Sequence, residues 1–88
     1  MTDEPVDLQA LPLHMARVVF PPMWVVCERP LDFPDGWTVR VWWGMTPEPR
    51  GYGFATLELA RGFIQRNGGC VRFERQQGDD PVVCESWL

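Results

Sequence analysis

The sequence predicts a single α+β domain, in which one helix lies on one face of a small, mostly antiparallel sheet. Three observations predict this fold. Short runs with β-type alternation stand on both sides of one segment, 54–69, whose apolar residues have helical spacing. Two further runs near the C-terminus flank a Gly/Asp/Pro turn, as in a β-hairpin. The expected order is β-β-α-β-β, and residues 13–20 could add a strand before it.

The first two expected strands are "MWVVCE" at 23–28 and "WTVRVWWG" at 37–44, joined by the turn-rich connection "RPLDFPDG". Alternation with period two places two sets of side chains on opposite faces of the second strand. The apolar set is Val39, Val41 and Trp43. The other set is Arg40 and Trp42.

The N-terminal part is expected to be an arm, residues 1–22, that is extended or partly disordered, while residues 23–88 form the domain. Within the arm, "LHMARVVF" at 13–20 alternates and could form the additional strand, which would end at two prolines. The stretch 45–53 contains two prolines and two glycines, so it is expected to be a loop.

The helix of segment 54–69 has an apolar stripe and end signals. Thr56 or Thr46 is the candidate N-cap, and the run Asn67-Gly68-Gly69 is typical of a helix end. The expected stripe has Leu57, Ala60 and Ile64 on one flank and Leu59 and Phe63 on the other. The expected solvent-facing residues are Glu58, Arg61, Gln65 and Arg66.

The tetrapeptide Val-Val-Cys-Glu occurs twice, at 25–28 and 82–85. The flanks of the two copies differ and nothing else recurs. Valine and free cysteine both suit a half-buried strand. We therefore interpret the match as two strands of similar composition, not as an internal repeat.

Composition restricts the partners. The net charge is −4, and lysine is absent from the 88 residues. This balance disfavours nucleic-acid binding, which usually needs a basic face. No apolar run is long enough to span a membrane, and the acidic N-terminus lacks the features of an export signal. We expect a cytoplasmic protein with no membrane partner.

Metal binding and catalysis find little support. Cys27, Cys70, Cys84 and His14 stand alone in different segments, without the C-x2-C spacing of a zinc site. We expect reduced structural thiols, no metal and no other cofactor. With a single histidine and no nucleophile motif, no catalytic residue is predicted. The aspartate pairs 32/35 and 79/80 lie in turns, where local backbone hydrogen bonding is their expected role.

The five tryptophans carry the strongest signal. One helix covers only one face of a sheet, and adjacent Trp42 and Trp43 point to opposite faces of a regular strand. If Trp43 joins the core, Trp42 lies on the uncovered face, with Trp24 or Trp87 nearby. Exposed aromatic clusters usually mark an interface or a ligand groove. The alternative is that the N-terminal arm folds over this face.

Three functions follow from this reasoning. The first is a non-catalytic interaction module that forms a homodimer or binds a protein partner through Arg40 and Trp42, supported by Trp24 and Trp87. The second is a small-molecule binding protein or minor enzyme, with a pocket gated by the 45–53 loop. In that case Arg50 or Arg72 would contact an anionic group. The third, which the net charge disfavours, is a nucleic-acid binder.

Two pieces of the sequence resemble a group of short uncharacterised bacterial proteins. They are "CERPLDFPDGWTVRVW" at 27–42, with a P-x-D-F-P turn, and "VRFERQQGDDPVVCESWL" at 71–88, with a D-D-P turn before the last strand. The resemblance extends from Met23 to the C-terminus. It implies the same small α+β fold, and no activity is attached to the group.

Overall fold

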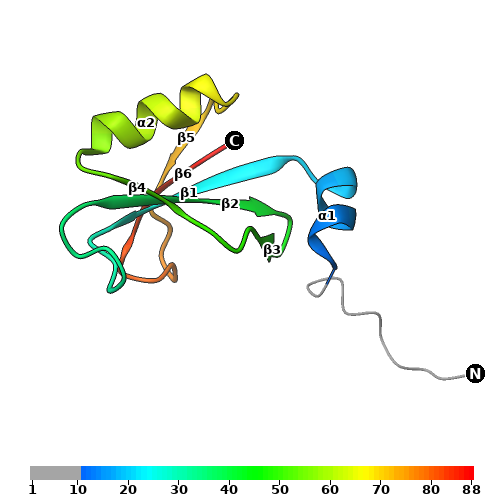
Figure 1. The fold of residues 1–88 in the computed structure, drawn as a ribbon, viewed down its shortest axis with the longest axis horizontal. Coiled ribbons are helices and arrows are strands. Elements are labelled where there is room, and N and C mark those ends of the chain that lie inside the picture. Colours follow the sequence, from blue (N-terminus) through cyan, green and yellow to red (C-terminus); the bar gives the residue numbers. More distant parts are fainter. Residues whose placement is uncertain (1–10) are drawn as a thin grey trace, which may run out of the picture.

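The computed structural model describes residues 11–88 and confirms the α+β class, with one helix across one face of an antiparallel sheet (Figure 1). The elements are α1 (Leu13–Val19), β1 (Pro22–Glu28), β2 (Trp37–Trp43), β3 (Thr46–Pro47), β4 (Tyr52–Phe54), α2 (Leu57–Arg66), β5 (Arg72–Glu74) and β6 (Val83–Trp87). The strand order is β3-β2-β1-β6-β5, and β4 pairs with the same edge of β2 as β3 does. Neither helix in this part of the chain is long and apolar enough to cross a membrane.

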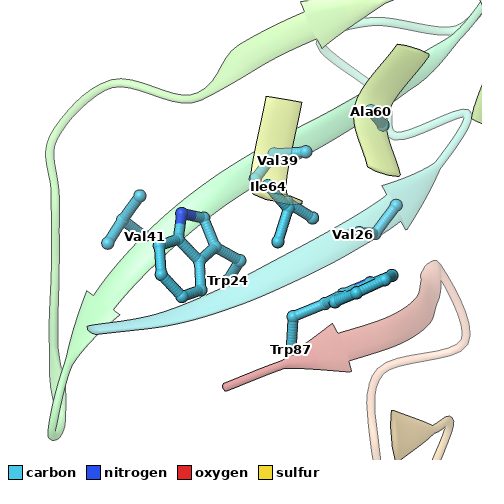
Figure 2. Packing of buried hydrophobic residues seen from close by; sticks show 7 residues of the cluster. All are labelled: Trp24, Val26, Val39, Val41, Ala60, Ile64 and Trp87. Atoms are coloured by element: carbon cyan, nitrogen blue, oxygen red, sulfur yellow. The ribbon is translucent and has the colours of Figure 1, made fainter. Parts of the chain in front are cut away.

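The core lies between the sheet and α2. The alternation predicted for β2 is confirmed, because Val39 and Val41 are buried and Trp43 packs against the same cluster. Figure 2 shows side chains of β1, β2 and β6 gathered around two residues of α2. The buried cluster is Trp24, Val26, Val39, Val41, Ala60, Ile64 and Trp87.

Helix α2 begins where the sequence predicts. The Leu59 backbone N–H donates to Thr56 Oγ1 at 3.2 Å, which makes Thr56 the N-cap. Two details differ from the prediction. Leu59 is exposed, because it lies on the flank that turns away from the sheet. Arg61 does not face away into solvent; its guanidinium reaches Glu85 of β6.

The prediction of a strand at 13–20 is wrong, because this segment forms helix α1. A short apolar run with weak alternation does not separate the two structures, and tertiary contacts decide between them. In the helix, Ala16 is completely buried and Arg17 pairs with Glu48 at 2.9 Å. Helix α1 therefore packs against β2 and β3 at one end of the sheet (Figure 1). Residues 1–10 of the predicted arm lie outside the described residues.

The prediction that 45–53 is a loop is also wrong in part. Thr46–Pro47 and the start of β4 form an interrupted edge strand along β2. Gly53 pairs with Thr38, and the Phe33 ring packs so close to it that a Cβ there would lie 3.0 Å from the ring. Gly53, one of the two glycines that suggested a loop, instead allows this close approach.

Candidate functional site: the open face

A hollow of about 490 Å³ occupies the sheet face that α2 leaves uncovered, which we call the open face. Its floor comes from alternate residues of the central strands: Val25, Cys27, Thr38, Arg40, Trp42 and Val83. Two connections wall it, the loop 29–36 and the turn 76–82, and both hang from the sheet on the side opposite α2 (Figure 1). Gly51 and Gly53 border the hollow along the β4 edge.

The loop 29–36 is held in place by its own backbone and by one aromatic ring. The Arg29 N–H donates to the Gly36 carbonyl at 2.8 Å and closes the loop, with Arg29 at a φ of 49°. Phe33 packs against Gly36 and Gly53, positions where a side chain would collide with its ring. Pro30, Asp32 and Phe33 are thereby directed at the hollow.

The turn 76–82 forms the other wall, and its aspartates have the predicted local role. Asp79 Oδ2 accepts from the Gln76 N–H at 2.8 Å, and Asp80 Oδ1 accepts from the Val82 N–H at 3.1 Å. The Glu28 N–H donates to the Val82 carbonyl at 2.8 Å, which ties the turn to β1. Asp80 also lines the hollow, so one carboxylate both stabilises the turn and contributes charge to the site.

The electrostatics of the hollow are mixed. Arg40 lies on the floor, and within residues 11–88 it makes none of the observed ion pairs. Asp32 and Asp80 stand on the walls. Burial, and next the charge of Asp80, raise the pKa of the Cys27 thiol. Cys27 is therefore a protonated, weakly nucleophilic group at neutral pH, which does not suit it for covalent catalysis.

The structure brings together the two predicted residues Arg40 and Trp42, both of which line the hollow. It does not place Trp24 and Trp87 with them, so that expectation is wrong. These two tryptophans pair with each other across β1 and β6, and each is 5% exposed in the core on the helix side. Trp24 is paired with Val41 of β2, so the two side chains lie on the same face of the sheet. Trp42 is the next residue along β2, and its side chain therefore points to the opposite face.

The predicted anion contacts also fall outside the hollow. Arg50 is exposed and does not line it. Arg72 lies on the opposite face, with its guanidinium 3.8 Å from Glu85. The wall residues Asp32, Phe33 and Asp80 were missed as parts of a site, although both turns were recognised. These residues line the hollow because the loop 29–36 and the turn 76–82 lie below the sheet. The local sequence pattern predicts that a turn is present but not where it lies relative to the sheet.

No group of three His, Cys, Asp or Glu side chains in the described part of the chain is arranged to hold a metal ion. His14 is exposed on α1 and does not line the hollow. The hollow is suited to binding an apolar group beside the Arg40 guanidinium, with the carboxylates of Asp32 and Asp80 at its rim.

No protein-family model, curated protein or solved structure matches this chain. The resemblance to short bacterial proteins therefore stays a prediction.

Proposed function

We propose that this protein is a non-catalytic interaction module that forms a homodimer through its open face. The observation that carries the proposal is the position of Arg40 and Trp42 on the floor of a concave, largely apolar hollow that no described element covers. An aromatic residue beside an arginine, in a depression of the surface, is the composition typical of interface centres.

Charge complementarity favours a second copy as the partner. A two-fold interface brings the same surface of both subunits together, so each group must find its complement on that surface. The open face carries both signs, with Arg40 on the floor and Asp32 and Asp80 on the walls. In such a pair, Arg40 of each copy would meet a wall carboxylate of the other.

Shape complementarity points the same way. Leu31 is fully exposed on the loop 29–36, next to wall residues Pro30 and Asp32. A leucine in this position is an apolar projection beside an apolar depression. Two copies related by a two-fold axis could each insert Leu31 at the other's hollow, which would remove both apolar surfaces from water.

Sedimentation equilibrium over a micromolar concentration range tests the proposal. We expect a monomer–dimer equilibrium in the wild type, and Leu31→Asp or Arg40→Glu should weaken it at least about tenfold. Leu59→Asp is the matched control, because Leu59 is also an exposed leucine but lies on α2, across the sheet. A wild type that stays monomeric throughout, or a Leu59→Asp effect as large as that of Leu31→Asp, contradicts the proposal.

A small-molecule ligand is the second candidate, because a volume of about 490 Å³ lies within the usual range of ligand pockets. Arg40 would meet an anionic group, while the apolar floor and Phe33 would hold the remainder. A thermal-shift screen against anionic metabolites, repeated with Arg40→Gln, separates the two candidates. A ligand-dependent rise in Tm in a monomeric protein, lost in Arg40→Gln, would favour this second function.

The proposed location is the cytoplasm. Cys27, Cys70 and Cys84 are all free thiols. Thiols persist in reducing compartments, whereas small exported domains usually carry disulfides.

A further inference from the structure

A second pocket, of about 250 Å³, lies on the helix side of the sheet, across from the open-face hollow. It is bordered by β1, β2, β4 and the end of α2, and aromatic residues from all four elements line it. The lining residues are Pro22, Trp24, Val41, Trp43, Glu48, Tyr52, Phe63 and Asn67. Nothing in the proposed dimer uses this pocket.

Two of the lining aromatic rings, Tyr52 and Phe63, pack against each other. The Tyr52 and Phe63 centroids lie 4.7 Å apart with a tilt of 38°, and Phe63 is also packed against Phe54 at 5.2 Å. Tyr52 and Trp43 keep part of their surface accessible. The faces of aromatic rings carry partial negative charge and attract cations, most strongly for tryptophan.

A carboxylate completes the pocket. Glu48 Oε1 accepts from Trp43 Nε1 at 3.0 Å and from Arg17 Nη2 at 2.9 Å. Both donors use the same oxygen, so within residues 11–88 Glu48 Oε2 accepts none of the observed hydrogen bonds. Burial alone would raise the pKa of Glu48, but the bonds from Trp43 and Arg17 outweigh it and lower the pKa. Glu48 is therefore ionised at neutral pH.

The end of α2 adds to the negative potential. Asn67 is the C-cap of this ten-residue helix and lines the pocket. The C-terminal end of a helix carries a partial negative charge, which favours cations nearby. Aromatic rings, an ionised carboxylate and the C-terminal end of α2 thus border one small space.

The chain already places one cation at this site. The Arg17 guanidinium lies 5.9 Å from the centroid of the Trp43 ring and forms an ion pair with Glu48. Arg17 comes from α1, and its side chain is 49% exposed. It contacts two of the lining residues, Trp43 and Glu48, and is not itself a lining residue.

We infer that this pocket binds a methylated ammonium group, with Glu48 as the counter-ion and Trp43, Tyr52 and Phe63 as walls. A quaternary ammonium has no N–H to satisfy and a weakly hydrated surface, so an aromatic enclosure holds it better than it holds a primary ammonium. Arg17 competes with the ligand for Glu48. The group could belong to a free choline-like metabolite or to a methylated lysine side chain, because both present the same chemistry.

Titration followed by NMR tests the inference, with the Trp43 indole N–H as the reporter. The probes are choline, Nα-acetyl-trimethyllysine amide, and 3,3-dimethylbutan-1-ol, the uncharged analogue of choline. We expect both cations to shift the Trp43 signal and the alcohol to leave it unchanged. The cation that binds more tightly identifies the source of the group. Equal shifts from choline and the alcohol would overturn the inference, because the pocket would then be selecting shape without charge.

Three variants test the inference: one should weaken choline binding, one should strengthen it, and one is a control. Glu48→Gln keeps the size of the side chain and should weaken choline binding about five- to tenfold. Arg17→Gln removes the competing cation and should tighten it about two- to threefold. Arg75→Gln, a charge loss at an exposed residue of the connection between β5 and β6, is the control and should change nothing. Thermal unfolding of each variant verifies that it is folded.

The outcomes separate cleanly. Binding that is visible only in Arg17→Gln supports the pocket and identifies Arg17 as the cation that competes for Glu48. Absence of a shift in both the wild type and Arg17→Gln overturns the inference, and so does unchanged affinity in Glu48→Gln. Since the pocket and the open face lie on opposite sides of the sheet, neither result depends on the oligomeric state.

Discussion

Trp42 and Trp43 are joined by one peptide bond and serve opposite faces of the sheet. Trp43 packs against the core and donates to Glu48, whereas Trp42 lines the open-face hollow. A regular strand requires this divergence, because successive side chains point to opposite sides. The pair therefore separates an indole that packs on the core side of the sheet from one that lines the open face.

The two indoles should differ in their contribution to stability. Trp43→Phe removes buried contacts and the bond to Glu48, so we expect a loss of about 1–2 kcal/mol in the free energy of unfolding. Trp42→Phe should change it by no more than about 0.5 kcal/mol at protein concentrations where the monomer dominates. Urea titrations at two protein concentrations measure both. Equal losses would mean that Trp42 is also part of the monomer core.

Glu85 should make stability depend on pH. It is 1% exposed, and it accepts from Arg61 at 2.7 Å and from Trp87 Nε1 at 2.6 Å. Burial alone would raise the pKa of Glu85, but the bonds from Arg61 and Trp87 and the charge of Arg61 outweigh it and lower the pKa. A carboxylate whose pKa is lowered by folding stabilises the protein above its unfolded pKa. That contribution is lost as the pH falls from about 4.3 through the lower folded pKa.

Glu85→Gln tests this pH dependence. We expect a loss of about 1–3 kcal/mol at pH 7, since the amide accepts more weakly than the carboxylate and leaves Arg61 without its counter-charge. The loss should shrink in acid, where the wild type also loses the charge. Tm measured by circular dichroism between neutral and acidic pH gives both values. A Tm difference between variant and wild type that stays constant with pH would contradict the assignment.

Gly36 should be intolerant of a side chain. A Cβ there would collide with the Phe54 carbonyl oxygen and with the Phe33 ring, which hold the loop 29–36 against β4. Gly36→Ala should therefore cost about 2 kcal/mol or more. Gly51→Ala is the control, because the nearest atom to its added Cβ is at 3.5 Å, an ordinary contact. That variant should be neutral or slightly stabilised, which chemical denaturation would show.

Thiol labelling should distinguish the three cysteines. Cys70 is exposed, whereas burial raises the pKa of both Cys27 and Cys84. At neutral pH an alkylating reagent should modify Cys70 first, and modification of the other two should accelerate at higher pH as thiolate forms. Peptide mass spectrometry resolves the order. In the proposed dimer, Cys27 on the hollow floor should also become slower to react as protein concentration rises, while Cys84 should not.

Sequence periodicity predicted the layers well and the connections poorly. The faces of β2 followed from alternation alone, and Thr56 as N-cap followed from local hydrogen bonding, which needs no distant partner. Helix α1 could not be predicted in this way, because it is stabilised by packing against β2 and β3, where its one buried residue, Ala16, lies. Arg40 and Trp42 were predicted to lie on the uncovered face, but the walls that make this face a hollow depend on the positions of two loops below the sheet.

The two Val-Val-Cys-Glu segments show where local information ends. They lie side by side as antiparallel neighbours, with Val26 paired to Glu85 and Cys27 to Val83 across a bulge. Their glutamates nevertheless differ, because Glu28 is exposed and Glu85 is buried. The identical local sequence determined only that both segments form strands. Burial was decided by the tertiary structure, since α2 brings Arg61 over β6 and supplies the counter-charge without which a carboxylate could not leave water.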